Sequence, residues 1–273
     1  MTEFFSALSQ PFMQRALIVG VLISVCAALL GVVLVLKRYA LIGHGLADIG
    51  FASLSLAIAM GWSPLYVSMP IVAVASFAIM LISQKSGSGG DTAIGVVSTA
   101  SLAGGIIITH LAGGMNVDVY SYMFGSILGT TDSDLYLSIP LAIIVIVSFI
   151  LLYNRLFMVT YDETYAKACG INVTLYQFFI SFLTAVTVVI GMRMMGTLLI
   201  ASLIIFPALI SKRLVRSFKS VVIISSVVSV TCFLIGMVIS YFLDLPVGAS
   251  IVAVNMAFLA IASLMCKLKI TKI

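Results

Sequence analysis

Charged side chains are scarce in this sequence: Asp, Glu, Lys and Arg make up 8% of its 273 residues. Soluble globular chains carry about 25%. Hydrophobic residues make up 62%, and the mean hydropathy is +1.28. This composition excludes an ordinary soluble protein. It predicts an all-α polytopic bundle in a membrane, because apolar helices satisfy their backbone hydrogen bonds internally.

The chain also lacks signs of an attached soluble domain. No Pro/Ser-rich linker, low-complexity run or heptad array interrupts it, so we expect one transmembrane domain over 1–273. The four cysteines have no CxxC spacing, which argues against a disulfide framework or a structural zinc site. The glycine-rich turn at 84–95 lacks the lysine and the spacing of a P-loop. ATP hydrolysis is therefore not expected of this chain.

Apolar segments of spanning or near-spanning length follow one another along the chain. We count nine, at 13–36, 44–60, 64–83, 92–112, 135–153, 173–190, 195–211, 219–241 and 247–266. A further piece at 117–128 is too short to cross and carries Asp118. A re-entrant or surface helix is expected there, since lipid does not tolerate exposed irregular backbone.

Basic residues fall at alternate connections between these segments. They are Lys85, Arg155, Lys167, Lys212, Arg213, Arg216, Lys219, Lys267, Lys269 and Lys272. By the positive-inside rule, these connections and the C-terminus are cytoplasmic. Nine crossings would put the N-terminus outside, which Lys37 and Arg38 favour. Eight crossings with an interrupted second segment would put it inside, which the glycine-broken stretch 43–61 favours. We expect eight spans with a broken second segment, and nine as the alternative.

His44 and Asp48 stand four residues apart in the apolar stretch 41–50, which reads LIGHGLADIG. On a helix this spacing puts both side chains on one face. Imidazole and carboxylate together suit a divalent transition metal. A buried histidine that is hydrogen-bonded to the aspartate explains the pair equally well, so the residues alone leave both interpretations open.

The stretch 161–172 interrupts the hydrophobic pattern with the sequence YDETYAKACGIN. Its acidic start and its glycine predict a short amphipathic cytoplasmic helix that ends at the glycine. An ordinary solvated loop is the alternative interpretation.

Six motifs in order resemble the metal-importing permeases of the ATP-binding cassette superfamily. They cover nearly the whole chain and read GHGLADIGFAS at 43–53, DTAIG at 91–95, VDVYSYMFGSIL at 117–128, DETYAKACGI at 162–171, GTLL at 196–199 with Pro207, and LDLPVGAS at 243–250. One such match would be weak, whereas six in order are specific.

The resemblance implies a homodimeric permease of the bacterial cell membrane that receives zinc, manganese or iron from an extracytoplasmic binding protein. A separate cytoplasmic ATPase would drive import, and no permanently bound cofactor and no nucleic-acid partner are expected. It implies metal positions at His44, Asp48 and Asp244. The implied ATPase-coupling positions are Asp162, Glu163, Ala166, Lys167 and Gly170.

The acid and the histidine of the first motif are exchanged relative to the family. His44 stands where the family usually has aspartate, and Asp48 stands where it has histidine. The ligand types are unchanged, and both still lie on one helix face. The flanking residues at 49–55 resemble the zinc-type members of the family more than the others, although zinc, manganese and iron(II) share nitrogen and oxygen ligands.

Two other classes of protein carry ionisable residues inside apolar helices. A secondary, ion-coupled metal transporter would do so, but it would not need the cytoplasmic helix at 161–172. An intramembrane enzyme could use His44 as a general base oriented by Asp48. The sequence offers no nucleophile motif for it, so we expect a transport subunit and not an enzyme.

Overall fold

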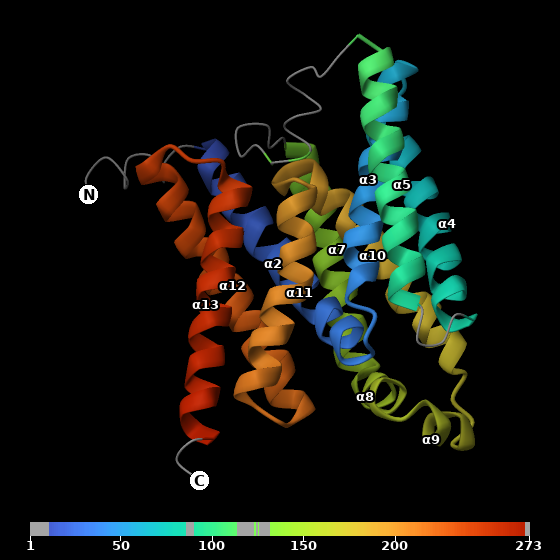
Figure 1. The fold of residues 1–273 in the computed structure, drawn as a ribbon, viewed down its shortest axis with the longest axis vertical. Helices are drawn as coiled ribbons and strands as arrows, with labels where there is room; N and C mark the ends of the chain where they lie inside the picture. Colours follow the sequence, from blue (N-terminus) through green and yellow to red (C-terminus); the bar gives the residue numbers. More distant parts are fainter. Residues whose placement is uncertain (1–10, 86–89, 114–122, 124, 126–131, 271–273) are drawn as a thin grey trace.

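The computed structural model describes residues 11–85, 90–113, 123, 125 and 132–270. Among them it has eleven helices and no strand, which confirms the all-α prediction (Figure 1). The helices are α2 (Pro11–Leu36), α3 (Leu41–Ala59), α4 (Pro64–Lys85), α5 (Gly90–Leu111), α7 (Asp132–Leu151), α8 (Tyr153–Tyr161), α9 (Glu163–Ala168), α10 (Val173–Met195), α11 (Thr197–Leu214), α12 (Phe218–Leu243) and α13 (Val247–Ile270).

Eight of the helices in the described residues are long and apolar enough to cross a membrane. A ninth candidate is the pair α7 and α8, which are bent by 74° relative to each other. The prediction of eight spans, with nine as the alternative, is therefore confirmed. The helices agree with the predicted segments to within a few residues, because sustained apolar runs of this length leave the backbone little choice but helix.

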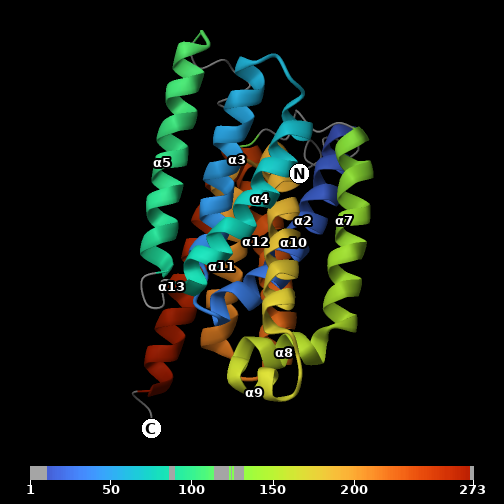
Figure 2. The same ribbon diagram turned by 90° about the vertical axis from the view of Figure 1, so that its right-hand side faces the viewer.

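The connections that carry basic residues lie at the same end of the helix bundle. α8, α9, the connection between α11 and α12 and the end of α13 all lie at one end of the bundle (Figures 1 and 2). Lys212 and Arg213 lie in the last turn of α11, so this is the basic end. α2 begins at the opposite end and runs toward α8 and α9 (Figure 1). The start of α2 thus lies on the side that nine crossings predict, and not on the basic side that eight crossings predict.

The expected break in the second segment is also wrong, because α3 is one continuous helix. Its glycines are contact points for neighbouring helices. A Cβ at Gly50 would lie 2.6 Å from Met192 Sδ of α10, and one at Gly45 would lie 3.0 Å from Ile94 Cγ2 of α5. Small residues let membrane helices approach closely, so these glycines serve packing and leave the helix regular.

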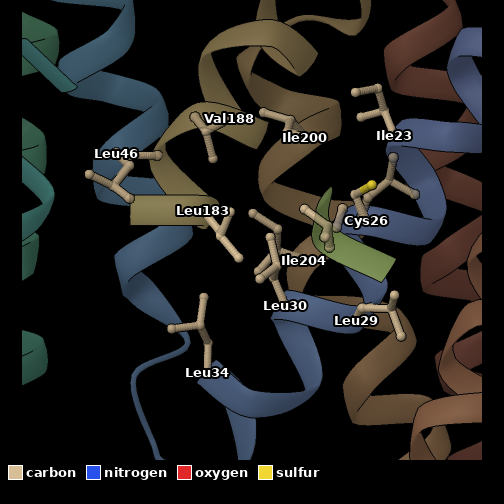
Figure 3. Packing of buried hydrophobic residues seen from close by; sticks show 14 of the residues in the cluster. Ile23, Cys26, Leu29, Leu30, Leu34, Leu46, Leu183, Val188, Ile200 and Ile204 are labelled. Atoms are coloured by element: carbon tan, nitrogen blue, oxygen red, sulfur yellow. The ribbon is translucent and has the colours of Figure 1, made fainter. Parts of the chain in front are cut away.

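The core is organised around α2, α3, α10 and α11. The share of the span that is buried is 78% for α2 but only 22% for α5 and 28% for α4. Leu30 of α2 gathers with Leu183 of α10, Ile204 of α11 and Leu46 of α3 (Figure 3). α5 stands on the outside of the bundle and α7 on the other side (Figure 2). The helix that carries His44 and Asp48 is therefore held between the core and the peripheral α5.

Candidate functional site

His44 and Asp48 lie on one face of α3, as predicted. His44 Nε2 is 3.7 Å from Asp48 Oδ2. Their surroundings differ sharply, because the His44 side chain is 51% exposed and the Asp48 side chain is 8% exposed. The pair therefore has an open side at the imidazole and a closed side at the carboxylate.

Ser98 of α5 closes the Asp48 side of the pair. Its hydroxyl donates a short hydrogen bond to Asp48 Oδ2, and both residues are buried. α5 comes this close because Gly45 has no side chain between the two helices. Sequence reasoning missed Ser98, since a serine inside an apolar span gives no local sign of the helix it will face. The hydroxyl fixes the carboxylate as outer partners of metal ligands do.

The arrangement can present one nitrogen and one carboxylate oxygen to a divalent ion. A neutral imidazole is the ligand form of histidine. The described part of the chain has no cluster of three or more His, Cys, Asp or Glu side chains that could enclose a metal. Two protein ligands are fewer than the four usual at a structural zinc site. The pair therefore suits transient handling of a dication better than permanent binding.

Asp244 lies apart from this pair. It follows the end of α12, at the opposite end of the bundle from the start of α3 (Figure 1). It is exposed and has φ 52, and its N–H donates to the Ser240 carbonyl, so it ends α12 in a left-handed conformation. Aspartate and asparagine tolerate this conformation better than most residues. The structure thus gives Asp244 a backbone role and does not bring it together with His44 and Asp48.

The predicted cytoplasmic helix is present as α9. Asp162 caps its start, accepting a hydrogen bond from the Tyr165 N–H at 2.9 Å. At its end, Ile171 N–H donates to the Ala166 carbonyl and Gly170 N–H donates to the Lys167 carbonyl. This is the pattern of a Schellman motif, and it requires the positive φ of 77 found at Gly170.

The remaining residues of this motif have different surroundings. Ala166 is completely buried and anchors α9 to the rest of the protein. Glu163 turns inward to Lys37 and Gln177, whereas Lys167 is exposed. The outward face also includes Tyr165, which is 58% exposed. Most of the residues that the motif singled out therefore build and anchor α9, and the outward face carries other side chains.

The predicted element at 117–128 lies outside the described residues except for Met123 and Gly125. A Cβ at Gly125, which has φ 81, would lie 2.3 Å from the Met195 carbonyl oxygen. The Thr197 hydroxyl donates to the Met123 carbonyl at 3.4 Å. These two contacts place Met123 and Gly125 against the break between α10 and α11.

Several proteins of similar sequence are named as membrane components of metal transport systems. The manganese import system permease protein ScaB of Streptococcus parasanguinis is 28% identical over 262 residues, which cover 96% of this chain and 93% of the relative. The high-affinity zinc uptake system membrane protein ZnuB of Haemophilus influenzae is 29% identical over 250 residues, which cover 91% of this chain and 95% of the relative. These relatives confirm the resemblance drawn from the motifs.

A solved structure shares the fold over nearly its whole length. PsaBC from Streptococcus pneumoniae in complex with Fab superposes with a TM-score of 0.84 at 27% identity, covering 96% of this chain and 94% of that chain. The model of the ABC 3 transport family matches residues 9–267. With its apolar spans and its near full-length relatives, this chain is a multi-pass bacterial membrane protein that belongs to the ABC 3 transport family.

Proposed function

We propose that this chain is the membrane-spanning subunit of an ATP-driven importer of divalent transition metal ions. The observation that carries the proposal is the His44–Asp48 pair, with its buried carboxylate held by Ser98 and its imidazole accessible. Ionisable side chains inside membrane spans mark substrate or ion pathways. The names of the relatives, which specify manganese and zinc, agree with this chemistry.

The proposed partners are a cytoplasmic ATPase, an extracytoplasmic metal-binding protein and a second copy of this chain. α9 offers a preformed docking element at the basic, cytoplasmic end, so we assign ATP hydrolysis to a separate cytoplasmic chain that binds there. An extracytoplasmic metal-binding protein would deliver the ion. A second copy of the chain would complete the metal path, because the described residues of one copy bring only two candidate ligands, His44 and Asp48, together. Zinc, manganese and iron(II) all fit an imidazole and a carboxylate, and we favour zinc as the first cargo to test.

The direct test is metal uptake by proteoliposomes that contain the whole complex, with Zn²⁺, Mn²⁺ and Fe²⁺ offered separately. We expect uptake of at least one ion, and we expect it to require ATP. Uptake that persists without ATP and follows a proton or sodium gradient would instead indicate a secondary transporter. No uptake of any of the three ions by an assembled complex would exclude the proposed function.

Replacing Ser98 by alanine is expected to weaken the apparent affinity for metal by about 10-fold or more. The hydroxyl orients a carboxylate ligand, and loss of such outer partners costs about 10- to 100-fold in metal affinity. The measurement is initial uptake rate against metal concentration. Thr99→Ala is the matched control, because the Thr99 hydroxyl is exposed and bonds only to its own helix at Gly95. Equal affinity in the two variants would remove Ser98 from the site.

Asp244→Asn is expected to reduce import at limiting metal by several-fold without lowering the amount of folded protein. The carboxylate would draw a dication toward the outer end of the path, and a neutral amide loses that attraction. Asparagine keeps the left-handed conformation that ends α12. The uptake rate should be measured at low and at saturating metal, and unchanged rates at both would leave Asp244 with only its role in the backbone.

A further inference from the structure

Lys37 is the last residue before the chain turns from α2 toward α3, and its side chain points into the protein. Its Nζ lies 2.7 Å from Glu163 Oε1 at the start of α9. Only 5% of the Lys37 side chain is exposed, compared with 41% for Glu163. The sequence indicated nothing more than a positive charge at a cytoplasmic connection, so this ion pair is a product of the tertiary structure.

The same carboxylate oxygen also accepts a hydrogen bond from Gln177 Nε2 of α10, at 2.7 Å. Gln177 is buried. One oxygen of Glu163 therefore joins three segments: the connection between α2 and α3, the helix α9, and the cytoplasmic part of α10. The pKa of Lys37 lies below its usual range because the side chain is buried. The Glu163 carboxylate beside it partly offsets this effect by raising the pKa, and the charge of Lys167 adds to the lowering.

The connection from Lys37 to α3 is short and internally bonded. Tyr39 N–H donates to the Leu34 carbonyl at 2.8 Å, and Arg38 N–H donates to the Val35 carbonyl at 3.2 Å. Arg38 adopts φ 63, a left-handed conformation that is unusual for a residue other than glycine. Strained backbone of this kind persists only where the surroundings hold it in place.

α3 begins at Leu41 and carries His44 in its first turn. Ile42 N–H donates to the Tyr39 carbonyl at 3.1 Å, so backbone hydrogen bonds continue from the connection into the first turn of α3. A displacement of α9 that moves Glu163 would act on Lys37 and, through this bonded turn, on the start of α3. The path from α9 to the candidate metal pair thus passes through one ion pair and one tight turn.

We propose that Lys37 is a positioning residue that couples the movement of α9 to the metal-carrying helix α3 through its ion pair with Glu163. This inference rests on the proposed function, because it assumes that α9 receives the ATPase and that His44 and Asp48 handle metal. It assigns to Lys37 a role in transmission that neither the motif nor the positive-inside pattern gives it.

The two partners differ in what their removal leaves behind. Lys37→Met leaves a carboxylate that is partly exposed and still bonded to Gln177, which water can solvate. Glu163→Gln leaves a buried cation without its counter-charge, which is the costly way to break such a pair. The double variant Lys37→Met with Glu163→Gln removes both charges. Folding defects should therefore be largest in Glu163→Gln and smaller in the double variant.

The test compares these variants as complete complexes in proteoliposomes. Import of Zn²⁺, Mn²⁺ or Fe²⁺ and ATP hydrolysis are measured in the same vesicles, and complex yield is measured separately. For Lys37→Met we expect an assembled complex that hydrolyses ATP but imports at least about fivefold less metal per ATP, the lower end of measured coupling between sites. The double variant should have near-normal yield and the same poor coupling.

Arg155→Met is the matched control. Arg155 Nη1 donates to the Tyr176 hydroxyl of α10 at 2.6 Å, so it too is a cation at the cytoplasmic end that joins two segments, but these are α8 and α10 and not α9 and the connection to α3. We expect this variant to import as much metal per ATP as the parent. An equal loss of coupling in Arg155→Met would show that the loss is not specific to Lys37, and it would overturn the proposal.

The remaining outcomes separate coupling from folding. If Lys37→Met and the double variant import as much metal per ATP as the parent, Lys37 has no role in coupling. If Lys37→Met does not assemble while the double variant assembles and couples normally, the pair serves folding alone, which also overturns the proposal. If the parent complex imports none of the three ions, it is the proposed function that fails, and this result is distinguishable from the other two.

Discussion

Replacing either His44 or Asp48 by alanine is expected to reduce metal import by more than about 100-fold. Loss of an outer partner alone costs about 10- to 100-fold in metal affinity, and these substitutions delete a ligand itself. Asp48 is the buried member of the pair and His44 the accessible one, so both changes should leave the helix α3 in place. The measurement is uptake of the preferred ion by proteoliposomes that contain equal amounts of complex.

Ser53→Ala is the matched control for these two variants. Ser53 is a buried polar residue of the same helix, and its hydroxyl bonds only to the Gly50 carbonyl of its own backbone. It should import metal as the parent does. Normal import by His44→Ala and by Asp48→Ala, at normal expression, would show that the two residues form an ordinary hydrogen-bonded pair and that the metal path lies elsewhere.

The exchange His44→Asp with Asp48→His restores the order that the family usually has. The structure makes the two positions unequal, because position 48 is enclosed between α3 and α5 whereas position 44 is open. An imidazole at position 48 must fit a space now filled by a smaller carboxylate, although the Ser98 hydroxyl can still donate to a ring nitrogen. We expect import at a reduced rate and with a changed preference among zinc, manganese and iron.

Replacing Gly170 by valine is expected to reduce import about 5- to 30-fold and to weaken binding of the ATPase. Gly170 has φ 77, and a Cβ there would meet nothing within 4 Å, so the penalty comes from the backbone alone. Left-handed geometry costs about 1–2 kcal/mol for a residue with a Cβ, which corresponds to about 5- to 30-fold in an equilibrium. A six-residue helix has few other interactions to hold its end.

Gly170→Asn is the control for this change, because asparagine tolerates the left-handed conformation better than other residues do. Membrane insertion, copurification of the ATPase and metal uptake should be measured for both variants. We expect Gly170→Asn to be close to the parent and both variants to insert normally. Unchanged copurification and uptake in Gly170→Val would remove α9 from the coupling pathway.

The residues of the α9 motif form two groups: those that fix the helix in place and those that face outward. Asp162 and Gly170 set the two ends of the helix, and Ala166 fixes it to the core. Side chains on the outward face, such as Tyr165, are left to contact a partner. We therefore expect motif residues to control the orientation of α9, and outward-facing residues to supply much of the direct contact area with the ATPase.

The spans could be read from the sequence because they depend on local properties. Runs of about 20 apolar residues specify membrane helices almost independently of their neighbours. The same holds for α9, since Asp162 and Gly170 are end signals that act within a few residues. That His44 and Asp48 lie on one face of the helix also follows from their spacing alone. Each of these predictions needed only a short window of sequence.

The tertiary structure decided everything that depends on which helices meet. The glycines of α3 could have broken the helix or packed it, and contacts with α5 and α10 made them packing sites. Ser98 became the partner of Asp48, and Lys37 became the partner of Glu163, across 50 and 126 residues of sequence. Hydropathy and helical period are local quantities, whereas helix packing depends on the shape of two surfaces. The sequence by itself thus determined the class, the spans and the paired residues, and the packing decided which side chains hold them in place.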